Sequence, residues 1–203
     1  VLEKPFFVSE WDMPWPNEFR AESPILYAAV GALQGWSGFT IHTYAYGTLL
    51  NEMKILGKEA SSASIGGVPY REGIFSTWND PAKFGLFYHA ALITRRGDVS
   101  KAKNKYAIKI DTLSTSVKPA FKVSSELSQI ASYYGGDTDA QVISENHVLV
   151  DEKAGEVTSD TGEMYRSWEK NYGIIDTEMT KCAYGFLGKN SPIKLKGLTI
   201  SSK

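Results

Sequence analysis

A carboxylate and several aromatic rings are the side chains of this sequence with the clearest potential for chemistry. Glu10 lies near the end of the apolar run 5–11, "PFFVSEW", and the next loop carries Trp15 between two prolines. An acid at such a position is ordinarily an exposed residue where a strand leaves the core. Tryptophan and tyrosine in loops offer flat apolar faces on which sugar rings can stack, although most such rings are half-buried packing residues. Two interpretations of Glu10 follow, a solvated exit residue or a reactive group beside a sugar.

The composition excludes several classes of function. Of the 203 residues, 42% are hydrophobic and 22% are charged, which is typical of a globular chain with one large or two small domains. The 22 basic and 23 acidic residues are scattered, so we expect no nucleic acid and no membrane partner. Cys182 is the single cysteine, and His42, His89 and His147 lack the spacing of metal ligands. We therefore expect neither a metal nor another cofactor.

The first strand-to-helix unit is marked by its terminal residues. We expect a strand over 5–11, apolar enough to be buried on both faces, and a helix over 24–34. Ser23 is the expected N-cap, Pro24 the first helical residue and Gly35 the stop.

A second unit follows after a short turn. Its strand is expected over 39–46, and the Asn79-Asp80-Pro81 segment caps a helix over 82–98. The expected buried face of this helix contains Phe84, Phe87, Tyr88, Ala91 and Leu92. Two such units with long strand-to-helix loops indicate a parallel α/β architecture whose functional loops follow the strand ends.

The pattern changes near residue 104. Short alternating runs, separated by turns such as 160–162, predict an antiparallel sheet, and one helix is expected over 124–134. We therefore divide the chain into α/β units over 1–103 and a β-rich accessory domain over 104–203. The segment 159–163, "SDTGE", is superficially similar to an aspartic protease motif, but the sequence has no second copy, so a turn is favoured.

These segments together resemble a known enzyme clan. The strand ending in "VSEW", the helix "AAVGALQGW" and the strand "SGFTIHTYAY" resemble the seventh and eighth units of (β/α)8-barrel retaining glycoside hydrolases. That clan includes cellulase-like, mannanase-like and β-galactosidase-like families. Its bacterial cellulase-like members have a last barrel helix similar to "NDPAKFGLFYHAALITRRGDV" and a β-sandwich-like appendage similar to "VTSDTGEMYRSWEKNYGIIDTEMTKCAYGFLG". The resemblance implies the last two units of a TIM barrel followed by an antiparallel β-domain.

The resemblance also implies an activity, the cleavage of a β-linked polysaccharide with Glu10 as nucleophile. Such a carboxylate attacks the anomeric carbon while a second carboxyl, about 5 to 5.5 Å away, protonates the leaving oxygen. In the clan this acid/base glutamate follows an asparagine at the fourth strand, a unit that this sequence does not contain. Glu18 and Glu22 are better explained as helix-start residues. We therefore expect half of a catalytic pair, completed by the remaining N-terminal part of the barrel.

Aromatic and imidazole side chains complete the expected site. The residues expected to contact sugar are Trp11, Trp15, His42, Tyr44, Tyr46 and Trp78, the last within the long loop 47–79. Ordinary packing is the competing interpretation for each, and His42 departs from the clan, which usually has an apolar or acidic residue there. Polysaccharide size implies a secreted or periplasmic enzyme. The start at Val1, without a signal peptide or initiator methionine, favours an excised or processed piece.

Two other functions remain open. In a non-catalytic carbohydrate-binding or structural module, Glu10 would only form hydrogen bonds. In a small independent α/β domain, Glu10 would lie on an open surface with no cleft.

Overall fold

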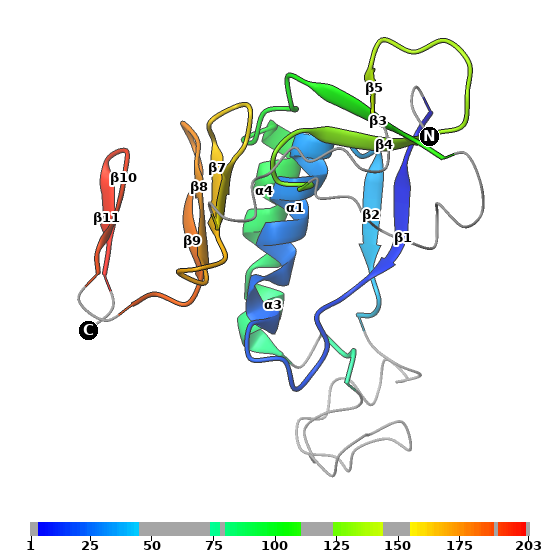
Figure 1. Ribbon diagram of the computed structural model, residues 1–203. Coiled ribbons are helices and arrows are strands. Elements are labelled where there is room, and N and C mark those ends of the chain that lie inside the picture. The colour runs from blue at the N-terminus through cyan, green and yellow to red at the C-terminus, as the bar shows by residue number, and fades with distance from the viewer. Residues whose placement is uncertain are drawn as a thin grey trace.

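The computed structural model describes residues 4–44, 74–77, 80–110, 124–143, 155–188 and 191–201. A layer of helices lies between two groups of strands (Figure 1). On one side are β1 (Phe7–Trp11) and β2 (Gly38–Ile41), and on the other is the sheet of β6 (Glu156–Thr158), β7 (Met164–Ser167), β8 (Tyr172–Asp176) and β9 (Lys181–Gly185). Within these ranges no helix combines the length and the apolar character needed to cross a membrane.

The first unit has the predicted strand and helix, with two differences of detail. Strand β1 pairs in parallel with β2, and the register shifts between Val8 and Trp11. Helix α1 (Ser23–Gln34) follows the short 3-10 helix η1 (Arg20–Glu22) and ends at Gly35, whose φ of 67° suits glycine. Ser23 does not cap α1, because its hydroxyl donates to the Arg20 carbonyl oxygen. The expectation that β1 is buried on both faces is wrong, since the Phe7 side chain is 55% exposed.

The second helix is broken in two, which changes its buried face. Asp80 caps α3 (Pro81–Gly85) through the Lys83 backbone N–H, and α4 (Phe87–Arg96) starts after Leu86. In α4 the residues that join the buried cluster with α1 are Ala90 and Ile93, which are not in the predicted stripe. Of that stripe, Phe84 is 47% and Tyr88 68% exposed, and Ala91 is also exposed, so these three are wrong. Phe87 and Leu92 are half-buried, and Phe87 packs on Trp11.

The predicted helix over 124–134 is also wrong. Strand β4 (Gln129–Tyr133) pairs in parallel with β3 (Lys105–Lys109), which pairs in parallel with β5 (Gln141–Ile143). The physical cause is Gln34, a buried side chain at the end of α1. Its Nε2 donates to the Ser125 and Ser128 carbonyl oxygens at 2.7 and 2.6 Å, and its Oε1 accepts from the Ile130 backbone N–H at 3.0 Å. These bonds hold the segment extended, and this sheet is parallel rather than antiparallel.

The sheet of β6 to β9 is antiparallel throughout, in agreement with the prediction for this part of the chain. The predicted turn at 160–162 is confirmed between β6 and β7. Its Asp160 carboxylate accepts hydrogen bonds from the Lys103 and Asn104 backbone N–H groups and from the Ser128 hydroxyl. The "SDTGE" segment therefore ties this hairpin to the chain that precedes β3. A second antiparallel hairpin, β10 (Ile193–Leu195) and β11 (Leu198–Ile200), follows the sheet.

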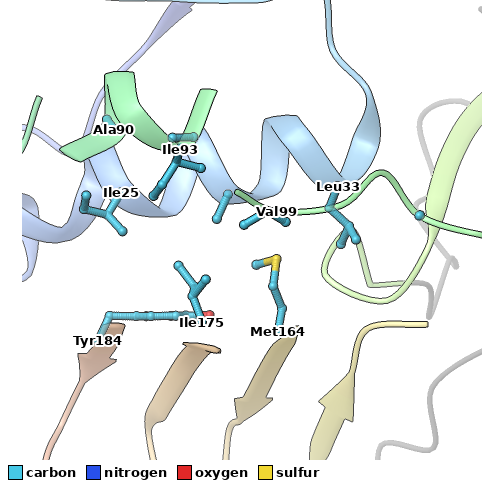
Figure 2. Packing of buried hydrophobic residues seen from close by; sticks show 11 residues of the cluster. Ile25, Leu33, Ala90, Ile93, Val99, Met164, Ile175 and Tyr184 are labelled. Carbon is cyan, nitrogen blue, oxygen red and sulfur yellow. The ribbon is translucent and has the colours of Figure 1, made fainter. Parts of the chain in front are cut away.

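One hydrophobic cluster joins the sheet to the helices. Met164 of β7 and Ile175 of β8 point toward the helices, and the Tyr184 side chain of β9 lies flat across the sheet toward Ile175 (Figure 2). All three share one cluster with Ile25 of α1 and Ile93 of α4. The Tyr184 ring lies directly over the backbone of β8 at Gly173. Residue 173 must be glycine, because a Cβ there would lie 2.2 Å from the Tyr184 ring. The boundary drawn before residue 104 thus falls between two segments that share this cluster.

Truncating Met164 should weaken the whole molecule. This side chain is 1% exposed, so Met164→Ala should lower the free energy of unfolding by about 2 to 5 kcal/mol. Met179 is 62% exposed and provides a matched control, for which Met179→Ala should change that free energy by less than about 0.5 kcal/mol. Urea unfolding followed by tryptophan fluorescence and by circular dichroism measures both. Equal effects of the two substitutions would contradict the shared cluster.

Asp98 should give the chain an acid-sensitive link between α4 and β9. Its carboxylate accepts hydrogen bonds from Arg96 and, at 2.7 Å, from the Thr180 hydroxyl, and the Arg96 guanidinium lowers the pKa of this carboxyl below its ordinary value of 3.8. A lowered folded-state pKa stabilises the fold above about pH 4, and this contribution is lost as the pH falls further. Asp98→Asn should therefore flatten the loss of stability on the acid side in urea titrations at successive pH values. Asp137→Asn, at an exposed carboxyl, should leave that loss unchanged.

Candidate functional site

The carboxyl ends of the two parallel strands bring several predicted site residues to one edge. Glu10 is the penultimate residue of β1 and its side chain is exposed. His42 directly follows β2, and its backbone N–H donates to the Trp11 carbonyl oxygen at 2.9 Å. Tyr44 lies two residues further on and is 50% exposed. The parallel pairing therefore places Trp11 beside Ile41 and His42, while Thr43 and Tyr44 continue to backbone hydrogen bonds with the chain at 75–77.

Trp11 occupies the opposite side of β1 from solvent. Its side chain is 6% exposed and stacks on Tyr27 of α1, with ring centroids 4.2 Å apart and an interplanar angle of 17°. Phe39 and Phe87 lie on the same ring cluster. The expectation that Trp11 stacks on sugar is therefore corrected, because both strand and helix cover its ring. Trp11 anchors the end of β1 on the helical layer.

The other predicted aromatic residues differ in exposure. Trp15 is half-buried, and the Arg20 guanidinium carbon lies 4.9 Å from its ring centroid, so a cation covers the ring. His42 is half-buried beside Phe75, with ring centroids 5.4 Å apart. Tyr44 packs against Phe84 at 6.1 Å and keeps half of its surface open. Tyr44 is thus the predicted aromatic residue best placed to meet a ligand, while Tyr46 and Trp78 lie outside the described residues.

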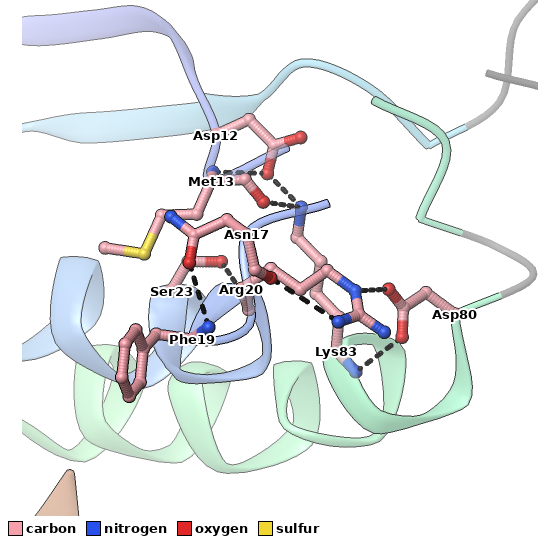
Figure 3. Close-up of polar contacts among 8 residues, drawn as sticks. All are labelled: Asp12, Met13, Asn17, Phe19, Arg20, Ser23, Asp80 and Lys83. Carbon is pink, nitrogen blue, oxygen red and sulfur yellow. Dashed lines mark hydrogen bonds and ion pairs between the residues drawn. The ribbon is translucent and has the colours of Figure 1, made fainter. Parts of the chain in front are cut away.

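Sequence reasoning missed a buried charge cluster directly after Glu10 (Figure 3). The Asp12 carboxylate forms an ion pair with the Lys83 ammonium of α3, and their side chains are 3% and 2% exposed. A second pair joins Arg20 Nε of η1 to Asp80 Oδ2 at 2.6 Å. Both pairs connect the loop after β1 to the start of α3. The sequence gives little indication of the Asp12–Lys83 pair, because lysine is rarely buried and the two residues lie far apart in sequence.

Burial decides the electrostatics of Asp12. Removal from water raises the pKa of its carboxyl, although the hydrogen bond and the charge of Lys83 act in the opposite direction. The Asp12 Oδ1 atom also accepts from the Met13 backbone N–H at 2.8 Å, while Lys83 Nζ reaches the Met13 carbonyl oxygen at 3.4 Å. The backbone of this loop is therefore held at two points, and two peptide bonds near the site, Trp15–Pro16 and His42–Thr43, are cis.

Neither nearby glutamate provides a visible partner for Glu10. The Glu22 carboxylate accepts from the Gly185 backbone N–H at 2.7 Å, and its pKa is raised by burial between η1 and β9. This contact gives Glu22 a structural role at β9, in addition to its position at the start of α1. Glu18 is exposed in the loop. In the part of the chain that the structure describes, no group of three His, Cys, Asp or Glu side chains is arranged to hold a metal ion.

Breaking the ion pair at Lys83 should be costly. Lys83→Met leaves the Asp12 carboxylate buried without its cation, so the free energy of unfolding should fall by about 3 to 5 kcal/mol in urea titrations. The control is Lys105→Met, which removes an ion pair to Asp139 with side chains 28% and 64% exposed and should cost about 1 kcal/mol or less.

A second variant separates charge from packing. Asp12→Leu combined with Lys83→Met removes both charges, and it should recover most of the stability lost in the single variant. If the single variant were no less stable than Lys105→Met, the Asp12–Lys83 pair would not hold this loop.

Comparison with known proteins adds no family to these observations. No protein-family model, no curated protein and no solved structure matches the chain. The geometry at the ends of β1 and β2 is therefore the basis on which a function can be assigned.

Proposed function

We propose that this chain forms the last two β/α units of a retaining glycoside hydrolase that cleaves β-linked polysaccharide, with Glu10 as its nucleophile. The observation that carries the proposal is the exposed Glu10 carboxylate at the carboxyl end of β1, which pairs in parallel with β2. Enzymes built from parallel β/α units bear their reactive groups at this edge. The open ring of Tyr44, two residues after His42, supplies a flat face at the same edge.

The proposed reaction is a double displacement. A Glu10 carboxylate oxygen bonds to the anomeric carbon while the bond from that carbon to the leaving oxygen breaks, and a carboxylic acid protonates the leaving oxygen. Water then attacks the anomeric carbon and gives a proton to the same acid/base residue, which releases Glu10. Because Glu22 is bound to Gly185, this second carboxyl is assigned to the preceding part of the barrel.

Rigid placement of the nucleophile is the contribution of the surrounding residues. The Trp11 ring is fixed on Tyr27, and Asp12 is fixed by Lys83. Glu10 precedes both anchors, so its backbone has little freedom to move away from an anomeric carbon. A reaction that needs the attacking oxygen at close range benefits from such placement.

Exposed apolar residues agree with further barrel units as the partner. Among the described strands, β1 pairs with β2 alone, and Phe6 and Phe7 at the start of β1 are 47% and 55% exposed. On the helical layer, Phe84 and Tyr88 are 47% and 68% exposed. Additional strands and helices of the same barrel would cover these surfaces. A polysaccharide substrate places the assembled enzyme outside the cytoplasm.

The alternative is a carbohydrate-binding module without catalysis. The observation in its favour is that the Glu10 side chain is exposed to solvent, as a residue that only forms hydrogen bonds to a ligand can be. In this case substitution of Glu10 weakens binding and no covalent intermediate forms.

Covalent trapping distinguishes the two functions. The natural polypeptide that carries this chain is incubated with dinitrophenyl 2-deoxy-2-fluoro-β-glycosides of the gluco, manno and galacto series. The activated leaving group does not need the acid, so a glycosyl adduct should form and should map by mass spectrometry to the peptide containing Glu10.

Matched substitutions complete the test. Glu10→Gln should abolish the adduct and reduce turnover by several orders of magnitude, whereas Glu18→Gln, at an exposed carboxyl in the next loop, should change neither. An adduct on another carboxylate would end the assignment of Glu10. Saccharide binding without any adduct or turnover would favour the binding module.

A further inference from the structure

A groove of about 540 Å³ lies on the far side of the β6 to β9 sheet from the helices. Side chains alternate across a strand, so Met164 and Ile175 face the helices while Tyr165 and Ile174 face away from them. These outward residues form one wall, and the chain entering β10, including Ile193, forms the other. Its volume is in the range of sites that hold small molecules.

The second wall, formed by the chain entering β10, is held in place by contacts of the β10–β11 hairpin. The Lys196 backbone N–H at the tip of the β10–β11 hairpin donates to Asp176 Oδ2 at 3.1 Å, and Asp176 forms an ion pair with Lys181 at 2.7 Å. Leu195 is 8% exposed, so the hairpin also buries an apolar side chain. The groove is therefore a preformed feature of this part of the molecule.

Two tyrosines present ring faces to the groove. The Tyr165 and Tyr172 rings lie 5.9 Å apart with an interplanar angle of 49°, and both side chains are half-buried. The Tyr165 hydroxyl donates to Glu156 Oε2 at 2.6 Å, which fixes the ring, and this bond raises the Tyr165 pKa to about 12. Both an apolar face and a polar edge are thus available, as a pyranose ring requires for its C–H face and its hydroxyls.

Two lysines bring positive charge to the groove, and the nearby Glu156 carboxylate is already engaged by the Tyr165 hydroxyl. Lys170, in the turn between β7 and β8, and Lys194 of β10 both line it, and both side chains are exposed. Among the described lining residues none is acidic, and no ion pair within the described ranges engages either lysine. A ligand that brings its own carboxylates would therefore find cations that are not already neutralised.

We propose that this groove binds an acidic oligosaccharide, with sugar rings against Tyr165 and Tyr172 and sugar carboxylates near Lys170 and Lys194. The proposal rests on the groove alone and does not depend on the activity assigned to Glu10. Neutral sugars would use only the ring faces, and free inorganic anions would use only the lysines. An acidic sugar uses both.

Calorimetric titration of the 203-residue chain with tetragalacturonate tests this proposal. We expect saturable binding, with at least tenfold weaker binding of the fully methyl-esterified tetramer, which keeps the sugar rings and loses the charge. Inorganic sulfate should compete only weakly, because it offers no ring. Absence of binding, equal binding of the ester, or equally tight binding of sulfate would overturn the proposal.

Substitutions locate the site. Lys170→Ala combined with Lys194→Ala should weaken tetragalacturonate binding at least tenfold and remove the preference over the ester, while Lys103→Ala, at an exposed lysine before β3, should have no effect. Tyr172→Ala should weaken the binding of both tetramers. Tyr172→Phe keeps the ring and should bind both tetramers as the unmodified chain does. If circular dichroism shows that Tyr172→Ala is unfolded, Tyr172→Phe and the double lysine variant carry the test. Unchanged affinity in the double lysine variant would place any binding elsewhere.

Discussion

Helix α1 must be covered on two sides, and the other described elements are arranged around this constraint. Ile25 and Leu33 belong to the cluster that receives β7, β8 and β9, whereas Tyr27 stacks on Trp11 of β1. At Gly31 the absence of a side chain lets the Phe39 ring of β2 approach, since a Cβ would lie 3.0 Å from it. A helix that is apolar around most of its circumference is stable only when it is buried. The β1–β2 pair and the antiparallel sheet therefore depend on the same helix.

Charges fix what apolar packing leaves undetermined. The hydrophobic effect has no direction, so it brings the loop after β1 near α3 without setting its path. The Asp12–Lys83 pair does set it, because a buried carboxylate and ammonium must meet to offset their loss of water. Arg20 and Asp80 form a second ion pair between this loop and the start of α3, and Arg20 is more exposed than Lys83. Glu10 precedes Asp12 by two residues, so these contacts fix the backbone that directly follows it.

Local signals in the sequence were sufficient where the chain contacts mostly itself. Pro24 and Gly35 bound α1, Pro81 follows the Asp80 cap of α3, and the turn at 160–162 needs only its own residues. These features depend on backbone preferences within a few residues of each other. The parallel relation of the first two strands was likewise implied by their order along the chain with a helix between them.

Distant contacts explain the failures. The segment at 124–134 contains a strand because Gln34, about 90 residues earlier, binds its backbone. The hydrophobic periodicity within the segment cannot indicate that distant contact. Trp11 could not be assigned to packing without knowing that Tyr27 lies beneath it. From sequence, Lys83 is expected to be exposed, because its burial depends on the ion pair with Asp12. For the proposed site, sequence therefore located Glu10 and Tyr44 but not the groups that hold them.

The two proposed sites lie on opposite sides of the helical layer, and this separation limits how they can act together. Strand β1 and the sheet of β7, β8 and β9 lie on opposite sides of the helical layer (Figure 1). Glu10 is the penultimate residue of β1, whereas residues of β7, β8 and the chain entering β10 line the groove. A short saccharide cannot contact both, so the groove is not a subsite of the cleavage reaction. Because Met164 and Ile175 pack on the same helix that carries Tyr27, the groove keeps a fixed orientation to Glu10. Under both proposals, one stretch of a long glycan would lie in the groove while another stretch reaches the strand ends.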